Sequence, residues 1–255
     1  MQIQQALYAF KNKTILISGA TSGIGLASAQ RAIQEGAFVY FTARNTEALA
    51  QTQALLGQQS HGIQCDHASV HQQQSMVSYL QHSAAHLDAV FLNAGNVHHE
   101  AFGQWDEQKF DEVFNTNIKG PFFLLQSLLP LLNPGCSVVL CGSTSIHIAL
   151  PQSSVYAASK IALRSLVKTL SRELLSQQIR FNLLSPGPTQ TPGLDKIASD
   201  ESTKLKLRAE IEQLVPLNRM ADSSEIADAF IYLASAESRF VIGTELLIDG
   251  GVANL

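Results

Sequence analysis

The chain has 255 residues, is 45% hydrophobic and carries a formal net charge of −4, so it is long enough to bury a large core. Its 17 Lys and Arg residues are scattered, which argues against a nucleic-acid surface. No apolar run reaches the roughly 18 residues that a membrane span requires, and residues 1–13 lack an apolar signal core. We therefore expect a cytoplasmic protein without nucleic-acid or membrane partners, and its three cysteines are expected to be reduced thiols.

A glycine-rich turn follows the first predicted strand, an apolar run at residues 13–18. After the turn, apolar residues at helical spacing predict a helix. Glycines allow a backbone to approach a pyrophosphate closely, and the start of a helix offers free N–H groups. Glycines also mark ordinary turns, but this position after a strand favours a dinucleotide site. The predicted cofactor-binding residues here are Gly19, Thr21, Ser22, Gly23, Ile24 and Gly25.

The second predicted strand, residues 37–42, is followed by Ala43 and Arg44. An acidic residue at this place would bind the 2′-hydroxyl of NAD(H) and repel a 2′-phosphate. The guanidinium of Arg44 suits a phosphate by charge and shape, so NADP(H) is favoured, although NAD(H) is possible. The alternative is that Arg44 is only a solvated loop residue.

The third and fourth predicted strands, 61–65 and 88–92, each end in candidate cofactor-binding residues. Asp66 is positioned to accept a hydrogen bond from the adenine amino group, and it could equally cap the helix that starts near Ser69. The small residues after the fourth strand would let a cofactor lie flat across the strand ends. They are Asn93, Ala94 and Gly95.

A long helix is predicted from about residue 106 to 132, with Asn117 polar in an apolar stretch. A buried amide costs free energy unless it is hydrogen-bonded. Asn117 is therefore either a satisfied core amide or a residue that holds a catalytic water. The fifth predicted strand, 136–142, ends at Ser143. His98 and His99 form the one histidine cluster, but no ligand spacing accompanies them and we predict no metal site.

Tyr156 and Lys160 lie at the start of a further predicted helix. Residues four apart share one helix face, so the ammonium would lie near the phenol. A nearby positive charge favours the phenolate and so makes a tyrosine more useful in proton transfer at neutral pH. The pair could also arise by chance on an ordinary helix face.

The last third of the chain continues the alternation, with strands predicted at 180–184 and 243–249 and a capped helix from 222. An irregular loop at 185–192 contains Pro186, Gly187, Thr189 and Thr191. The polar stretch that follows predicts a substrate lid at about 190–215. Strands and helices alternate without a linker. We therefore predict one α/β domain over residues 1–255, a Rossmann-type doubly wound fold whose mostly parallel sheet has about seven strands and helices on both faces.

Together these motifs resemble the compact short-chain dehydrogenase/reductase family from end to end. The matching order is the glycine turn, Asn93-Ala94-Gly95, Asn117, Ser143, Tyr156-x-x-x-Lys160, Pro186-Gly187 and the terminal Asp249-Gly250-Gly251. Two positions depart from the family's usual pattern. Ser18 stands where Thr is usual, and Leu92 where many members have Asn.

The resemblance implies an NAD(P)-dependent oxidoreductase that reduces carbonyls or oxidises secondary alcohols, with a catalytic set of Asn117, Ser143, Tyr156 and Lys160. Tyr156 would be the acid or base, Lys160 would bind the nicotinamide ribose, Ser143 would bond the substrate oxygen, and Asn117 would keep a water. Thr189 and Thr191 would hold the nicotinamide carboxamide. The resemblance also implies a homodimer or homotetramer. The alternative is a non-catalytic NADP-binding sensor or scaffold, although such proteins generally lack the Tyr or the Lys.

Overall fold

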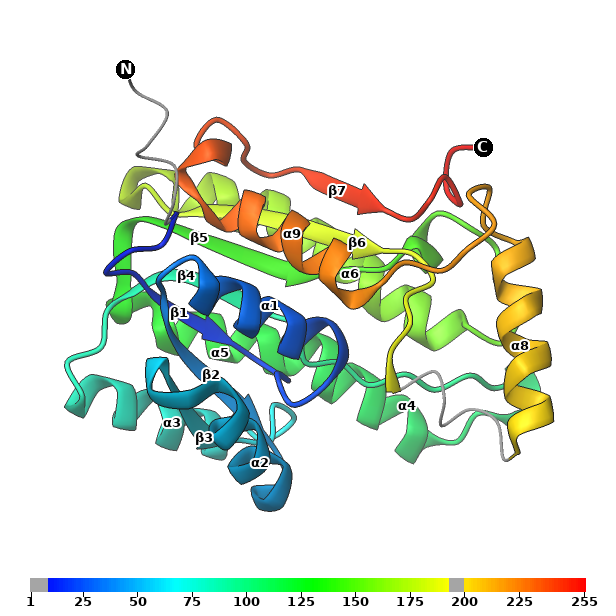
Figure 1. Ribbon diagram of the computed structural model, residues 1–255, viewed down its shortest axis with the longest axis horizontal. Coiled ribbons are helices and arrows are strands. Elements are labelled where there is room, and N and C mark those ends of the chain that lie inside the picture. Colours follow the sequence, from blue (N-terminus) through cyan, green and yellow to red (C-terminus); the bar gives the residue numbers. More distant parts are fainter. Residues whose placement is uncertain (1–8, 193–199) are drawn as a thin grey trace.

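The structure, a computed structural model, describes residues 9–192 and 200–255 (Figure 1). In these residues, seven parallel strands form one sheet in the order β3-β2-β1-β4-β5-β6-β7. The predicted fold class is confirmed, with every strand pair parallel. The strands are β1 Thr14–Ile17, β2 Phe38–Ala43, β3 Ser60–Gln64, β4 Leu87–Leu92, β5 Leu132–Cys141, β6 Arg180–Pro186 and β7 Glu245–Ile248.

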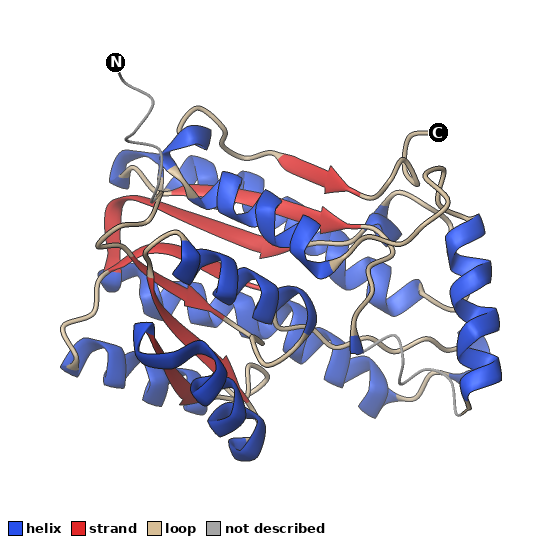
Figure 2. Cartoon of the chain, in the orientation of Figure 1, coloured by secondary structure: helices blue, strands red, loops and turns tan. Residues whose placement is uncertain are grey.

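Helices cover both faces of the sheet, and each face has its own apolar core (Figure 2). One core packs beneath α1, α2 and α9, and the other beneath α3, α5 and α6. Central strands contribute alternate side chains to the two cores, because successive residues of a strand point to opposite faces. The helices are α1 Gly23–Gln34, α2 Thr46–Leu56, α3 Val70–His82, α4 Glu107–Phe114, α5 Gly120–Leu128, α6 Ser154–Glu173, α8 Glu201–Gln213 and α9 Ser223–Ala234.

The strand order reverses direction at β1, whose neighbours are β2 on one side and β4 on the other. In open parallel sheets a ligand crevice opens at such a point, beyond the carboxyl ends of the strands. The turns after β1, β4, β5 and β6 all leave the sheet at this edge, and α8 stands beyond it at the right of Figure 1. None of the helices in the described part of the chain is long and apolar enough to cross a membrane.

The helix predicted over 106–132 is interrupted by a π-helical turn at residues 115–119. Asp106 caps its start through the backbone N–H of Lys109, and the Gly120 N–H donates to the Asn115 carbonyl, five residues back. Pro121 contributes to the interruption because it has no N–H to give to the preceding turn. Such turns inside α-helices are frequent at functional sites.

Close packing against the loop after β3 also fixes this turn. A methyl group on Gly120 would lie 2.1 Å from the His67 carbonyl oxygen, so only glycine fits. The buried Gln73 side chain donates to the carbonyls of both His67 (2.7 Å) and Gly120 (3.0 Å). The π turn and the β3 loop are therefore tied together.

Candidate active site

A cleft of about 460 Å³ opens at the carboxyl edge of the sheet. It brings together predicted cofactor-binding residues from six separate stretches of the chain. Of the predicted cofactor-binding residues, Gly25 alone does not line it. Those that do are Gly19, Thr21, Ser22, Gly23, Ile24, Arg44, Asp66, Asn93, Ala94, Gly95, Tyr156, Lys160, Pro186, Gly187, Thr189 and Thr191.

The glycine turn has the backbone geometry of a pyrophosphate cradle. Gly19 and Gly23 have φ values of +65° and +53°, which side chains other than glycine rarely adopt. Ser22, at the N-cap of α1, makes no side-chain cap bond, so the helix start keeps N–H groups for an anion. Gly25 acts behind the cleft, where a methyl group would lie 2.3 Å from the Gly19 carbonyl oxygen.

Two residues that the sequence analysis did not single out, Thr42 and His67, lie at the β2–β3 side of the cleft. The Thr42 hydroxyl accepts a hydrogen bond from the Gly19 N–H (3.4 Å) and contacts Nε2 of His67 (2.6 Å). The pKa of His67 is lowered to about 4, chiefly by burial and to a smaller extent by Arg44, against the opposing effect of Asp66. His67 is therefore neutral at physiological pH. A histidine after an apolar strand carries no sequence signal that marks this position.

Arg44 and Asp66 flank this end of the cleft. Arg44 is exposed, and no carboxylate pairs with its guanidinium in residues 9–192 or 200–255. Asp66 does not cap α3, since the N-cap is Ser69, whose hydroxyl accepts from the Gln72 N–H. Instead Asp66 accepts from the Ala68 N–H (3.0 Å) and so closes the turn before the helix.

Ser143, Tyr156 and Lys160, from the β5–α6 side of the sheet, all line the cleft. Tyr156 and Lys160 stand on the first turns of α6, and the Lys160 ammonium lies 5.7 Å from the centre of the Tyr156 ring. The Lys160 side chain is buried and donates to the Cys141 carbonyl at the end of β5 (2.7 Å). Ser143 follows β5 in extended conformation, and its hydroxyl accepts from the Ser145 N–H (3.2 Å).

Asn117 lies in the π turn behind the cleft and is fully hydrogen-bonded to protein. It accepts from the Asn96 N–H (2.8 Å), and donates to the Asn96 carbonyl (2.9 Å) and the Ser159 hydroxyl (2.9 Å). A methyl group on Gly95 would lie 3.4 Å from the Lys160 nitrogen and 3.5 Å from Oδ1 of Asn117. The satisfied core amide is thus observed directly, whereas the role with a catalytic water stays a prediction.

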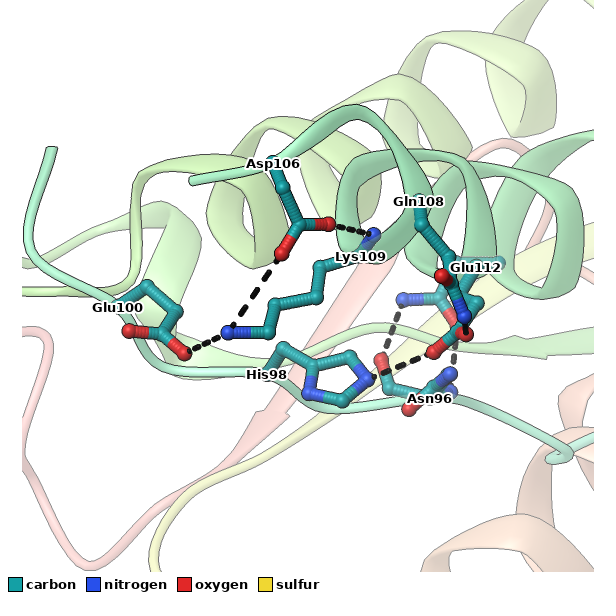
Figure 3. Close-up of polar contacts among 8 residues, drawn as sticks. Asn96, His98, Glu100, Asp106, Gln108, Lys109 and Glu112 are labelled. Carbon is teal, nitrogen blue, oxygen red and sulfur yellow. Dashed lines mark hydrogen bonds and ion pairs between the residues drawn. The ribbon is translucent and has the colours of Figure 1, made fainter. Parts of the chain in front are cut away.

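The loop after β4, residues 96–100, is held against α4 by side-chain pairs (Figure 3). His98 contacts Glu112 (3.1 Å), and Glu100 accepts from Lys109 (2.5 Å). Nδ1 of His99 instead contacts the Ser153 hydroxyl (2.8 Å). The two neighbouring histidines therefore have separate partners. Across residues 9–192 and 200–255, no three His, Cys, Asp or Glu side chains gather into a group that could hold a metal ion.

His147, beyond Ser143, lies beside β7, and the predicted lid follows β6 in the chain. His147 pairs with Glu245 of β7 (2.9 Å), which also meets Arg164 (2.9 Å) and Ser185 (2.7 Å). Within the predicted lid, 200–213 contains helix α8, and 193–199 lies outside the described residues. Thr189, in the loop before the lid, donates to the Gly187 carbonyl (2.9 Å).

Comparison with known proteins shows what the chain is similar to. Residues 19–253 match the family model described as "Enoyl-(Acyl carrier protein) reductase". The chain is 34% identical to oxidoreductase asL5 of Sarocladium schorii, over 98% of this chain and 99% of that one.

Solved structures agree with the sequence relatives. A short-chain dehydrogenase/reductase described as a glucose/ribitol dehydrogenase from Brucella melitensis superposes with a TM-score of 0.89 at 28% identity, covering 96% of this chain and 98% of that one. A blue fluorescent protein from a metagenomic library, solved in complex with NADPH, superposes with a TM-score of 0.86 at 25% identity, covering 95% and 98%.

Proposed function

Because the chain belongs to the short-chain dehydrogenase/reductase family of NAD(P)-dependent oxidoreductases, we propose that it interconverts a small-molecule carbonyl and its secondary alcohol, with NADP(H) as the preferred cofactor. One observation carries the proposal. Ser143, Tyr156 and Lys160 line the same cleft as a glycine turn built for a pyrophosphate. The residues fit a dinucleotide, since positive φ angles and an uncapped helix start lie at one end and the ammonium at the other.

The residues of this chain would divide the work of carbonyl reduction as follows. When bound, the reduced cofactor supplies a hydride to the carbonyl carbon. The Tyr156 hydroxyl gives its proton to the carbonyl oxygen, which becomes the alcohol. Ser143 donates a hydrogen bond to that oxygen as negative charge builds on it. In alcohol oxidation the proton returns to Tyr156.

Lys160 supports Tyr156 through charge and position. Its ammonium is buried and lies within 5.7 Å of the Tyr156 ring centre, where little water screens the field. One N–H is directed to the Cys141 carbonyl, which leaves others for the hydroxyls of the nicotinamide ribose. Asn117 holds Asn96, and thereby the loop that packs over Lys160, in place.

Replacement of Tyr156 by Phe tests the mechanism, because it keeps the ring and removes the proton. We expect NADPH to bind as before and kcat to fall by about 10²- to 10⁴-fold, the usual contribution of a general acid. Turnover is measured as NADPH consumption with a panel of ketones and aldehydes. A Tyr156→Phe enzyme that works at the parent rate would contradict the mechanism. A parent protein that binds NADPH and reduces no member of a broad panel would favour the sensor or scaffold alternative.

The preference for NADP(H) rests on Arg44. Its guanidinium stands at the cleft without a carboxylate partner in the described residues, and no acidic residue ends β2. A 2′-phosphate would pair with it by charge and fork geometry.

Arg44→Ala is expected to lower the ratio of NADPH to NADH affinity by about tenfold, or ~1.4 kcal/mol, by loss of one charged contact. Dissociation constants from cofactor fluorescence give the ratio. Arg172→Ala, at an exposed position near the end of α6, is the matched control and should leave it unchanged. If the ratio of NADPH to NADH affinity were the same in the parent and in Arg44→Ala, the proposed contact between Arg44 and the 2′-phosphate would be contradicted.

We also propose that the chain forms a homodimer or homotetramer through α4, α5 and α6. Apolar side chains on these helices are exposed in the single chain, namely Phe110, Phe122, Phe123 and Ile161. Exposed apolar groups gathered on neighbouring helices are typical of an interface. Sedimentation analysis of the parent and of Phe122→Asp measures the oligomer, and a monomeric parent would contradict this part of the proposal. The lid at about 190–215 remains our candidate for substrate selection.

A further inference from the structure

His99 occupies a position that the proposed reaction does not use. Its ring centre lies 6.2 Å from that of Tyr156, with the two planes tilted by 59°. One substrate can therefore reach both rings, since each hydrogen bond adds about 3 Å. The side chain also keeps an exposed edge, unlike the buried histidine at position 67.

One hydrogen bond holds the imidazole, and further contacts hold the loop that carries it. The ring contacts the Ser153 hydroxyl, and the next residue bonds the same segment through its backbone, from the Glu100 N–H to the Gln152 carbonyl (2.9 Å). On the opposite side the loop is clamped to α4 by His98–Glu112 and Glu100–Lys109 (Figure 3). A side chain held in this way is preorganised to meet a ligand.

Hydrogen bonding assigns the tautomer of the ring. Ser153 is buried at the N-cap of α6, yet its hydroxyl makes no cap bond. In the described residues its only side-chain partner is Nδ1 of His99 (2.8 Å), and the buried hydroxyl hydrogen is satisfied only if it is donated to that nitrogen. Partial burial and the neighbouring His98 lower the pKa of His99, which favours the neutral ring. The single ring proton is then on Nε2, which is a hydrogen-bond donor.

We infer that His99 is a specificity residue that donates from Nε2 to a second oxygen of the substrate, a few bonds from the carbonyl that meets Tyr156. The substrate class is an oxygenated carbonyl compound, as distinct from a plain alkyl ketone. This inference rests on the proposed function of the same site. The discrimination comes from the donor, because an N–H that a bound substrate covers without offering an acceptor loses its water and gains no partner.

Two ketones of nearly equal shape test whether His99 donates a hydrogen bond to the substrate or only supports the loop. Methoxyacetone and 2-pentanone differ only in an ether oxygen in place of a methylene group. We expect His99→Phe, which keeps a ring and removes the donor, to lower kcat/KM for methoxyacetone by about tenfold relative to 2-pentanone. His99→Gln, which restores an N–H donor, should recover part of that ratio. His82→Phe, at an exposed position on α3, is the matched control and should leave the ratio unchanged.

The outcomes distinguish the inference from the function on which it rests. A parent enzyme that reduces both ketones and a His99→Phe variant with the parent's ratio would overturn the inference alone. Equal losses for both ketones in His99→Phe and Ser153→Ala would overturn it as well, because they would mean that the pair only holds the loop. A parent that reduces neither these ketones nor any other carbonyl would overturn the proposed function. His99→Ala serves as a second variant without a donor.

Discussion

Asn117 is the polar side chain whose removal should cost most in this site. It is 1% exposed and makes three hydrogen bonds, two to Asn96 and one to Ser159. Each bond contributes about 1 kcal/mol net, so Asn117→Ala is expected to lower the free energy of unfolding by about 3 kcal/mol. Asn96 is only partly buried, so in the variant its backbone N–H and carbonyl can bond to water. The loss of stability is therefore expected to be smaller than for fully buried groups left without a partner.

The chain offers a matched control in the same π turn. Asn115 has the same side chain, is only half-buried, and makes no side-chain hydrogen bond in the described residues. Its replacement by Ala should change stability by less than about 0.5 kcal/mol. Urea unfolding followed by circular dichroism gives both values, provided that the slope with denaturant is unchanged. Equal losses in the two variants would show that the three bonds to Asn117 do not hold the loop after β4.

Two further predictions concern buried polar groups. Because burial lowers the pKa of His67 to about 4, the unfolded chain takes up a proton below pH 6.5 and the folded one does not. The free energy of unfolding should therefore fall by up to about 3 kcal/mol as the pH falls from 6.5 to 4. Chemical unfolding of His67→Gln should show a weaker dependence of this free energy on pH. The same dependence in parent and variant would refute the prediction. Glu245→Gln removes the buried carboxylate shared by Arg164 and His147, and we expect a loss of about 1–3 kcal/mol in urea unfolding. Glu237→Gln, at an exposed position, is the control. If Glu245→Gln lost no more stability than this control, the pairs of Glu245 with Arg164 and His147 would not contribute to stability.

The fold could be predicted from sequence because its signals are local. Apolar runs bounded by glycines marked the strands, and helical spacing marked most helices. The helix over 106–132 was predicted without its break, because a π turn depends on what Gly120 packs against, and that neighbour is 53 residues away at His67. Pro121 alone is compatible with a helix start as well as with a break.

The same limit applies to the site. The glycine turn and the Tyr156–Lys160 pair depend on short spacings that sequence displays directly. Thr42, His67 and His99 depend on contacts between separate strands and loops, such as the 2.6 Å contact of Thr42 with His67. Their residue types are common on any surface, so only the three-dimensional arrangement distinguishes them.

The buried Gln73 side chain couples two segments that are far apart in the sequence. Its amide nitrogen donates both to the carbonyl of His67, which lines the cleft beside Asp66, and to the carbonyl of Gly120, next to the π turn that contains Asn117. The relative position of these two segments is therefore set partly by a residue that does not itself line the cleft. Gln73→Asn, which shortens the side chain by one methylene group, would loosen the loop after β3 and the π turn in a single step.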